Sequence, residues 1–166
     1  MQAVASKLDR PRVGMVTQEA DRLSAPFSVP PIPVIDIAEN SGVDVVFADF
    51  GNAGGQVAGF CDFKSAKLYV NANDATNRQT FTIAHELGHW ILHRDYFERH
   101  PDDYSILPRL QSVLRSDPFE QEANDFAAKL LVPRRLILPV KDAPVAELAR
   151  IFAVSRMMME IRLKNV

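Results

Sequence analysis

Residues 85 to 89 read HELGH, and this pattern constrains the 166-residue chain more than any other feature of its sequence. His85 and His89 are four positions apart, so on an α-helix their side chains point the same way, one turn apart, and can bind one metal ion. Apolar residues fall on the opposite side of that helix: Ile83, Ala84, Leu87 and Ile91. We therefore predict a helix that packs on a core with one face and lines a cleft with the other. The alternative, two ordinary surface histidines on an amphipathic helix, explains the pattern less well.

Glu86 lies on the flank of the face that carries both histidines. From there its carboxylate can remove a proton from a water molecule held by the metal, which is the role of a general base. A catalytic zinc ion usually has three protein ligands and one open position. His93 is on the same helix, but about 12 Å along the axis from His85, too far for a tetrahedral site built from one straight helix. We expect His93 to support a ligand indirectly or to pack, and the third ligand to come from another element.

The third ligand is expected in a second helix, predicted over residues 119–131 after the start signal Asp117-Pro118. On a helical wheel Glu120 lies about 60° from the centre of the apolar stripe and Glu122 about 100° from it. Glu120 is therefore predicted to face inward as the metal ligand, and Glu122 to be solvated. Asn124 follows Glu120 by one turn and is expected to orient a ligand by hydrogen bonding. The alternative for Glu120 is an acid that the helix dipole favours. The stripe consists of Phe119, Ala123, Phe126, Ala127, Leu130 and Leu131.

The remaining pattern predicts an α+β fold with a short, mainly antiparallel, three-stranded sheet packed with helices. Before residue 74 the apolar residues form short strand-like runs, and after it they recur mostly at helical spacing. The loops between the strands are too short for crossover helices, so we expect the strands to follow one another as an antiparallel meander. The glycine-rich loop at 51–55 matches neither phosphate-binding glycine pattern and is expected to be a hairpin loop. The strands are expected at 43–50, 57–63 and 67–70, with short helices at 18–23 and 34–39 around a proline-rich connector at 26–33.

The composition is that of one globular domain spanning residues 1–166, with 47% hydrophobic and 24% charged residues. The formal net charge is −2 and the pI about 6.1, so no overall basic field would attract nucleic acid. Its single cysteine, Cys61, can form neither an internal disulfide nor a cysteine-based metal site. We see no secretion signal and no apolar run long enough to span a membrane. The expected location is the cytoplasm, without membrane contact.

Together the two helical motifs resemble the ImmA/IrrE family of metallopeptidases. The resemblance is carried by TFTIAHELGH at residues 80–89, by Leu92-His93, and by the pattern ExxANxFAxxLLxP from Glu120 to Pro133. It extends upstream through residues 33–45, Gly59 and residues 69–71, and covers about 17–133. It implies a small zincin-like domain with a catalytic core at 17–135 and a gluzincin-like site. In that site His85, His89 and Glu120 would bind zinc or manganese, and Glu86 would be the general base.

The same resemblance implies a metal-dependent endopeptidase that acts on a repressor or antitoxin. The substrate would carry a helix-turn-helix of the XRE type and is often encoded nearby. Its cleavage would relieve repression in a stress response, in induction of phage or other mobile elements, or in toxin–antitoxin regulation. The alternative is a metal-stabilised protein-binding module, or the toxin of such a pair, with little or no peptidase activity. A structural zinc site of that kind would be closed by a fourth protein ligand.

Residues 142–166 predict a C-terminal helical hairpin that resembles a helix-turn-helix. Val145, Leu148, Ala149 and Phe152 form one apolar helix face, and Ser155 is a candidate cap for the next helix. We expect the hairpin to pack on the catalytic core or to meet the partner protein. Direct DNA binding is the weaker alternative, because the net charge is acidic although this segment is locally basic. The basic residues are Arg150, Arg156, Arg162 and Lys164.

Two further expectations concern the peptide substrate. The negative charge that develops on the carbonyl oxygen during hydrolysis needs a hydrogen-bond donor. Tyr96, His100 and Tyr104 lie between the two motifs and are candidates, and the sequence does not choose among them. The peptide itself is expected to add as an extra strand along the edge of the strand at 57–63.

Overall fold

The computed structural model describes residues 6–104, 106–108 and 117–166. The chain is α+β, as predicted, and all three expected strands are present. Among the described residues no helix combines the length and the apolar character that a membrane span requires. The elements in chain order are α1 (Val13–Ser24), α2 (Val34–Asn40), β1 (Asp44–Ala48), the 3₁₀ turn η1 (Gly51–Ala53), β2 (Val57–Asp62), β3 (Lys67–Asn71), α3 (Thr76–Arg99), η2 (Pro101–Asp103), β4 (Leu107–Pro108), α4 (Pro118–Leu131), α5 (Arg134–Ile137), η4 (Leu138–Val140), α6 (Val145–Phe152) and α7 (Arg156–Leu163).

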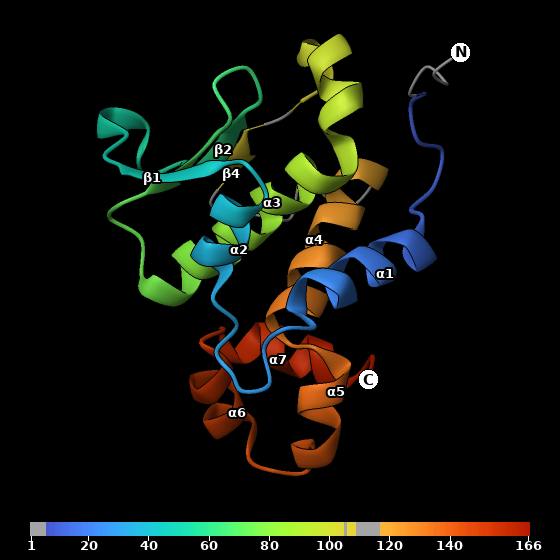
Figure 1. The fold of residues 1–166 in the computed structure, drawn as a ribbon. Helices are drawn as coiled ribbons and strands as arrows, with labels where there is room; N and C mark the ends of the chain where they lie inside the picture. Colours follow the sequence, from blue (N-terminus) through green and yellow to red (C-terminus); the bar gives the residue numbers. More distant parts are fainter. Residues whose placement is uncertain (1–5, 105, 109–116) are drawn as a thin grey trace.

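The sheet lies against α3, and the other helices are arranged around α3 and α4 (Figure 1). Helix α3 contacts β2 and β3 on one side and α4 on the other, while α1 packs on α4. Helices α5, α6 and α7 gather at the end of the molecule farthest from the sheet. A continuous cluster of buried hydrophobic side chains extends from Val16 in α1 to Met159 in α7. The helix that carries the HELGH pattern is therefore central, as its pattern predicts.

The sheet is mixed, and its strand order differs from the predicted meander. The order is β1-β3-β2-β4, in which β3 pairs parallel with β1 and antiparallel with β2, and the two-residue β4 pairs antiparallel with β2. The connection from β1 to β2 includes η1 and is long enough to pass the position that β3 later fills. The buried Asn71 fixes this connection, because its amide nitrogen donates to the carbonyl oxygens of Gly54 and Val57 at 2.9 and 3.0 Å. Two of the three pairings are antiparallel, so the sheet is mainly antiparallel as predicted, but it has a fourth strand and the meander order is wrong.

Gly88 allows α3 and α4 to approach each other closely. A Cβ atom at this position would lie 3.0 Å from Cδ1 of Phe126 and 3.3 Å from the backbone Cα of Ala123. The absent side chain thus lets one turn of α3 lie directly on α4. This close contact aligns the face of α3 that carries His85 and His89 with the first turn of α4.

Gly59 is required for packing between β2, β3 and α3. A Cβ atom there would lie 2.4 Å from the carbonyl oxygen of Tyr69 and 2.6 Å from Cγ2 of Thr82. We expect Gly59→Ala to lower the free energy of unfolding by about 1–3 kcal/mol, because the backbone must move to admit the methyl group. Urea denaturation measures this change. Gly55→Ala is the matched control, since a Cβ atom at Gly55 meets nothing within 4 Å, and equal stability of the two variants would contradict the prediction.

The C-terminal hairpin is present as α6 and α7. Ala153 makes the left-handed turn between them, and the hydroxyl of Ser155 caps α7 by accepting a hydrogen bond from the amide of Met158 at 3.1 Å. Arg162, one of the basic residues that suggested DNA contact, is 5% exposed and donates from Nε to the carbonyl oxygen of Val132 at 3.0 Å. This arginine therefore holds the hairpin against the end of α4 and does not present its charge to solvent.

Candidate metal centre

The two central helices bring His85 and His89 of α3 together with Glu120 of α4. One ligand atom from each of the three residues lies within 4.8 Å of the others. Nε2 of His85 is 2.9 Å from Oε2 of Glu120, and Nε2 of His89 is 3.0 Å from Oε1. All three side chains are at most 2% exposed. Two imidazoles and one carboxylate form a ligand set that suits zinc or manganese.

The hydrogen bonding of these residues fits a bound cation. Nε2 of His89 is buried and close to Glu120, yet it has no hydrogen-bond partner of acceptable geometry. Two groups that approach without a hydrogen bond between them are what a shared cation would leave, because each directs a lone pair toward the ion. Burial raises the pKa of Glu120, but the interactions with His89 and His85 outweigh it and hold that pKa well below its usual value. A carboxylate that stays ionised is the form that binds a metal.

Asn124 fixes the orientation of His85. Nδ1 of His85 lies 2.9 Å from Oδ1 of Asn124. An amide oxygen only accepts hydrogen bonds, so Nδ1 of His85 donates to Asn124, and Nε2 is directed at Oε2 of Glu120, to which it is hydrogen-bonded at 2.9 Å. The sequence pattern pointed to this residue, and the structure places it in contact with a candidate ligand.

His89 is supported by a longer chain of contacts. Its Nδ1 lies 2.9 Å from Nδ1 of His93, whose Nε2 lies 2.7 Å from Oε2 of Glu122. Glu122 in turn accepts hydrogen bonds from the backbone amide of Arg12 at 2.6 Å and from its guanidinium at 2.9 and 3.0 Å. His93 therefore contacts a candidate ligand, as expected, without being close enough to the other ligands to join them.

The prediction that Glu122 is solvated is wrong. Its side chain is fully buried, because α1 covers the face of α4 on which it lies. The helical wheel of α4 could not reveal this cover, since Arg12 is 110 residues away in sequence. Burial raises the pKa of Glu122, but hydrogen bonds from His93 and Arg12 outweigh this effect and lower that pKa to about 2. Glu122 is therefore ionised at neutral pH and can only accept hydrogen bonds.

Glu86 is fully buried beside the three candidate ligands. Its Oε2 accepts a hydrogen bond from the hydroxyl of Tyr104 at 2.7 Å, and its Oε1 has no partner among the described residues. Burial raises the pKa of Glu86 from 4.5 to about 7, although contacts with His85 and Tyr104 lower it in part. A carboxyl group with a pKa near neutrality is suited to take up and return a proton.

Of the three candidate oxyanion donors, only Tyr104 lies at this centre. Its hydroxyl accepts a hydrogen bond from the amide of Cys61 at 2.5 Å and donates to Glu86, and its ring centroid lies 5.7 Å from that of His89. Tyr96 donates its hydroxyl to Asp103 and stacks on His100, and the structure does not bring either ring to the candidate ligands. Tyr104 has no helical or strand pattern around it, which is why the sequence could not single it out.

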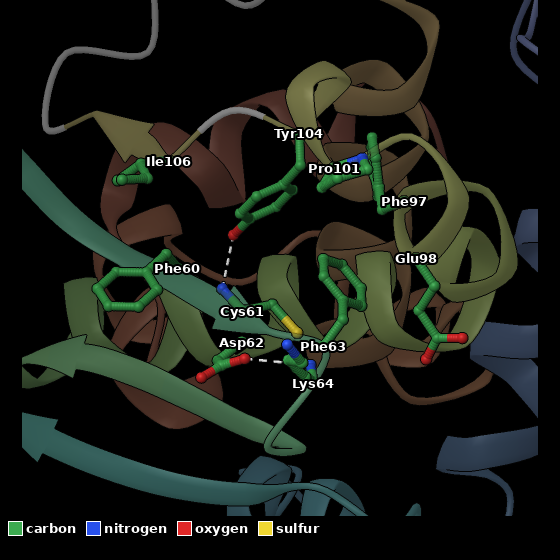
Figure 2. Close-up of a pocket in the computed structure, with 10 residues that line it drawn as sticks. All are labelled: Phe60, Cys61, Asp62, Phe63, Lys64, Phe97, Glu98, Pro101, Tyr104 and Ile106. Atoms are coloured by element: carbon green, nitrogen blue, oxygen red, sulfur yellow. Dashed lines mark hydrogen bonds between the residues drawn. The ribbon is translucent and has the colours of Figure 1, made fainter.

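A cavity of about 880 Å³ lies on the outer side of Tyr104 (Figure 2). The phenol ring of Tyr104 forms one wall, and its hydroxyl faces the amide of Cys61 on β2. Glu86 lies behind that hydroxyl, so one side chain separates the cavity from the candidate metal centre. The lining is mostly apolar and consists of Phe60, Cys61, Asp62, Phe63, Lys64, Phe97, Glu98, Pro101, Tyr104 and Ile106.

The expected peptide-binding edge is only partly free. β4 pairs with β2 at Val57 and Gly59, so the edge of β2 that faces away from β3 is already occupied in the first half of the strand. Beyond Gly59, the amide of Cys61 meets the hydroxyl of Tyr104 and not another strand. The prediction of an open edge along residues 57–63 is therefore wrong for the first half of β2.

Metal-free protein is expected to lose stability as the pH falls from about 6.5 to about 4, because of His93. Burial lowers the pKa of this imidazole from 6.5 to about 4. Between pH 6.5 and pH 4, His93 binds a proton in the unfolded chain but stays neutral in the folded protein. The free energy of unfolding therefore falls by up to about 3 kcal/mol as the pH falls. Urea denaturation at several pH values, with a chelator present, measures the slope. His93→Gln should lack this component, and an unchanged slope in that variant would contradict the assignment.

Two known proteins illustrate what this chain is similar to. A solved structure of a Mycobacterium tuberculosis transcriptional regulator is similar over 88% of this chain, with a TM-score of 0.62. Its sequence identity is 18%, so the likeness concerns the fold alone. An uncharacterized immunity region protein 2 of Bacillus phage phi105 is 29% identical over 89 residues, which is 52% of this chain and 52% of that protein. The chain thus spans about half the length of each of these two relatives.

A match to a protein family is more extensive. The sequence profile of Peptidase_M78, described as the IrrE N-terminal-like domain, matches residues 38–164. This range covers more than half of the chain and includes α3 and α4 with all three candidate ligands. It confirms the resemblance that the two sequence motifs suggested, and the chain accordingly belongs to the IrrE N-terminal-like family of peptidases.

Proposed function

We propose that the protein is a metal-dependent endopeptidase that cleaves a transcriptional repressor. The observation that carries this proposal is the arrangement around Glu86. A buried carboxyl group with a pKa near 7 lies beside three buried residues that can hold one cation. This combination suits hydrolysis of a peptide bond, because the carboxyl group can exchange a proton with water held by the ion.

In this proposal His85, His89 and Glu120 hold zinc or manganese. The bound ion would supply Lewis-acid polarisation of the peptide carbonyl and lower the pKa of water. Glu86 accepts a proton from the attacking water and passes it to the nitrogen of the leaving amine. The hydroxyl of Tyr104, which now donates to Glu86, is the donor placed to stabilise the negative charge on the carbonyl oxygen. Asn124 keeps Nε2 of His85 available by holding the hydrogen on Nδ1.

The proposed substrate segment is an extended peptide with a bulky apolar side chain. In this proposal the peptide backbone pairs with the end of β2 at Cys61, whose amide would pass from the hydroxyl of Tyr104 to the peptide. The adjacent cavity offers aromatic walls from Phe60, Phe63 and Phe97, which favour an apolar or aromatic side chain. Substrate peptides that differ only at one apolar position should therefore differ in kcat/KM.

The proposed partner is a helix-turn-helix regulator of the XRE type, encoded near the gene for this protein. The family resemblance and the phage immunity-region relative both support a repressor of a mobile element over the other regulators considered from the sequence. We propose that the reaction takes place in the cytoplasm, where such regulators act.

The decisive experiment incubates the protein, loaded with zinc or manganese, with the helix-turn-helix regulator encoded nearby. We expect one new cut, identified by mass spectrometry of the fragments. The cut should require metal and should be absent with Glu86→Gln. A stable complex with the regulator, formed equally by both versions and without any cut, would refute the proposal in favour of a protein-binding module or toxin component. Among the described residues the candidate group contains three ligands and no fourth, which favours a site open to water.

A further inference from the structure

Arg12 contributes to the candidate metal centre from outside the part of the chain that the family profile matches. The profile begins at residue 38, whereas Arg12 is the N-cap of α1. Its backbone amide and Nε both donate to Oε1 of Glu122, at 2.6 and 3.0 Å, and its Nη2 donates to Oε2 at 2.9 Å. The arginine side chain is 41% exposed and the glutamate side chain is fully buried. Arg12 therefore supplies, from the protein surface, the positive charge that balances the buried carboxylate of Glu122.

This contact determines which nitrogen of His93 carries its hydrogen. An ionised carboxylate has no hydrogen to donate, so Nε2 of His93, 2.7 Å from Oε2 of Glu122, must be the donor. The positive charge of Arg12 already balances Glu122, so a second positive charge on the buried His93 would be uncompensated. Nδ1 of a neutral His93 then has a lone pair and accepts a hydrogen bond.

The hydrogen on His89 follows from the same logic. Its Nδ1 lies 2.9 Å from Nδ1 of His93. Because the His93 nitrogen accepts, Nδ1 of His89 must donate, and the lone pair of His89 is left on Nε2. That nitrogen is the one next to Glu120 that lacks a hydrogen-bond partner. The opposite tautomer would place a hydrogen where a cation must bind.

We propose that Arg12, Glu122 and His93 are positioning residues that fix the metal-binding tautomer of His89. The inference rests on the proposed function, since it concerns the same metal centre. It assigns a role to α1, which lies outside the matched family range, and to a glutamate other than the metal ligand. Nδ1 of His85 is held by one residue, Asn124. Nδ1 of His89 is held by a chain of three residues: His93, Glu122 and Arg12.

The test measures metal affinity and the position of the hydrogen on His89, without any substrate. In metal-free protein, long-range ¹H–¹⁵N correlation spectra should find the hydrogen of His89 on Nδ1. Glu122→Gln presents an amide that both donates and accepts, so nothing then holds the hydrogen of His93 on Nε2. We expect the Nε2–H form of His89 to appear in this variant and zinc affinity to fall about 10- to 100-fold, measured by competition with a chromophoric chelator.

Arg12→Gln keeps Glu122 and should lower zinc affinity by about tenfold, the low end of the range for residues that orient ligands. Arg12→Lys keeps the charge without the forked geometry and should restore only part of the loss. Arg22→Gln is the matched control, because Arg22 lies on α1 and, within the part of the chain that the structure describes, pairs on the surface with Glu19. Its zinc affinity should equal that of wild type. The partial exposure of Arg12 makes its variants suitable should Glu122→Gln not fold.

Unchanged zinc affinity in Arg12→Gln, or a hydrogen on Nε2 of His89 in the metal-free wild type, would overturn the inference. These results are separable from failure of the proposed function. A protein that cleaves no regulator but follows the predicted affinities and tautomers would retain the positioning chain and lose only the peptidase. A protein that binds neither zinc nor manganese would refute both.

Discussion

Glu86→Gln is expected to lower kcat by about 10²- to 10⁴-fold while leaving metal affinity close to that of wild type. Glutamine has nearly the shape of glutamate, and its amide oxygen can still accept the hydrogen bond that Tyr104 donates to Glu86. It cannot accept a proton from water or return one to the leaving amine. The candidate ligands His85, His89 and Glu120 are unaltered, so the loss should concern proton transfer and not metal binding.

The measurement compares single-turnover cleavage of the regulator with metal content after dialysis. Asp95→Asn is a suitable control, because it removes an exposed carboxylate from the same helix without approaching the candidate ligands. Cleavage by Glu86→Gln at the wild-type rate would show that another group accepts the proton. Loss of metal in parallel with activity would instead assign Glu86 a role in holding the ion.

Glu120→Gln is expected to abolish most of the stabilisation that metal provides. For wild type, free zinc at a thousand times its dissociation constant should raise the free energy of unfolding by about 4 kcal/mol. The variant replaces the only carboxylate of the three ligands with a neutral amide, a poor metal ligand. At the same zinc concentration we therefore expect the melting temperature of the variant to rise little or not at all.

Thermal unfolding with zinc and with a chelator gives the comparison directly. Glu160→Ala is the control, because Glu160 lies on α7 in an exposed ion pair with Arg156, which contributes little to stability. Its melting temperature should rise with zinc as much as that of wild type. An equal zinc-dependent rise in Glu120→Gln and wild type would mean that the ion binds elsewhere. This result would also remove the structural basis of the proposed peptidase.

The positions of the candidate ligands can be predicted from the sequence where the information is local. HELGH needs only helical geometry to place His85 and His89 on one face, and the apolar stripe of α4 is enough to turn Glu120 inward. Glu122 escaped prediction because its burial depends on α1, which packs on α4 from a distant part of the sequence. A wheel drawn for a single helix contains nothing about a second helix that covers it.

The strand order of the sheet also depends on contacts between residues distant in sequence. Runs of strand-forming residues located β1, β2 and β3 to within a few positions. Their order depended on the connection before β2, which is held by Asn71 through hydrogen bonds across 14 and 17 residues. Tyr104 was one of three equal candidates, since its position follows from contacts with Cys61 and Glu86 and not from any periodic pattern.

The contact between Arg162 and the carbonyl oxygen of Val132 links the C-terminal hairpin to the helix that carries Glu120. Phe152 and Met159 of the same hairpin are at most 1% exposed and belong to the cluster that includes Leu87 and Phe126. Opening of α6 and α7 would therefore expose core shared with α3 and α4. Amide hydrogens in these four helices should exchange with solvent in one cooperative event. Opening of the hairpin and separation of the helices that carry the candidate ligands should therefore have the same free energy.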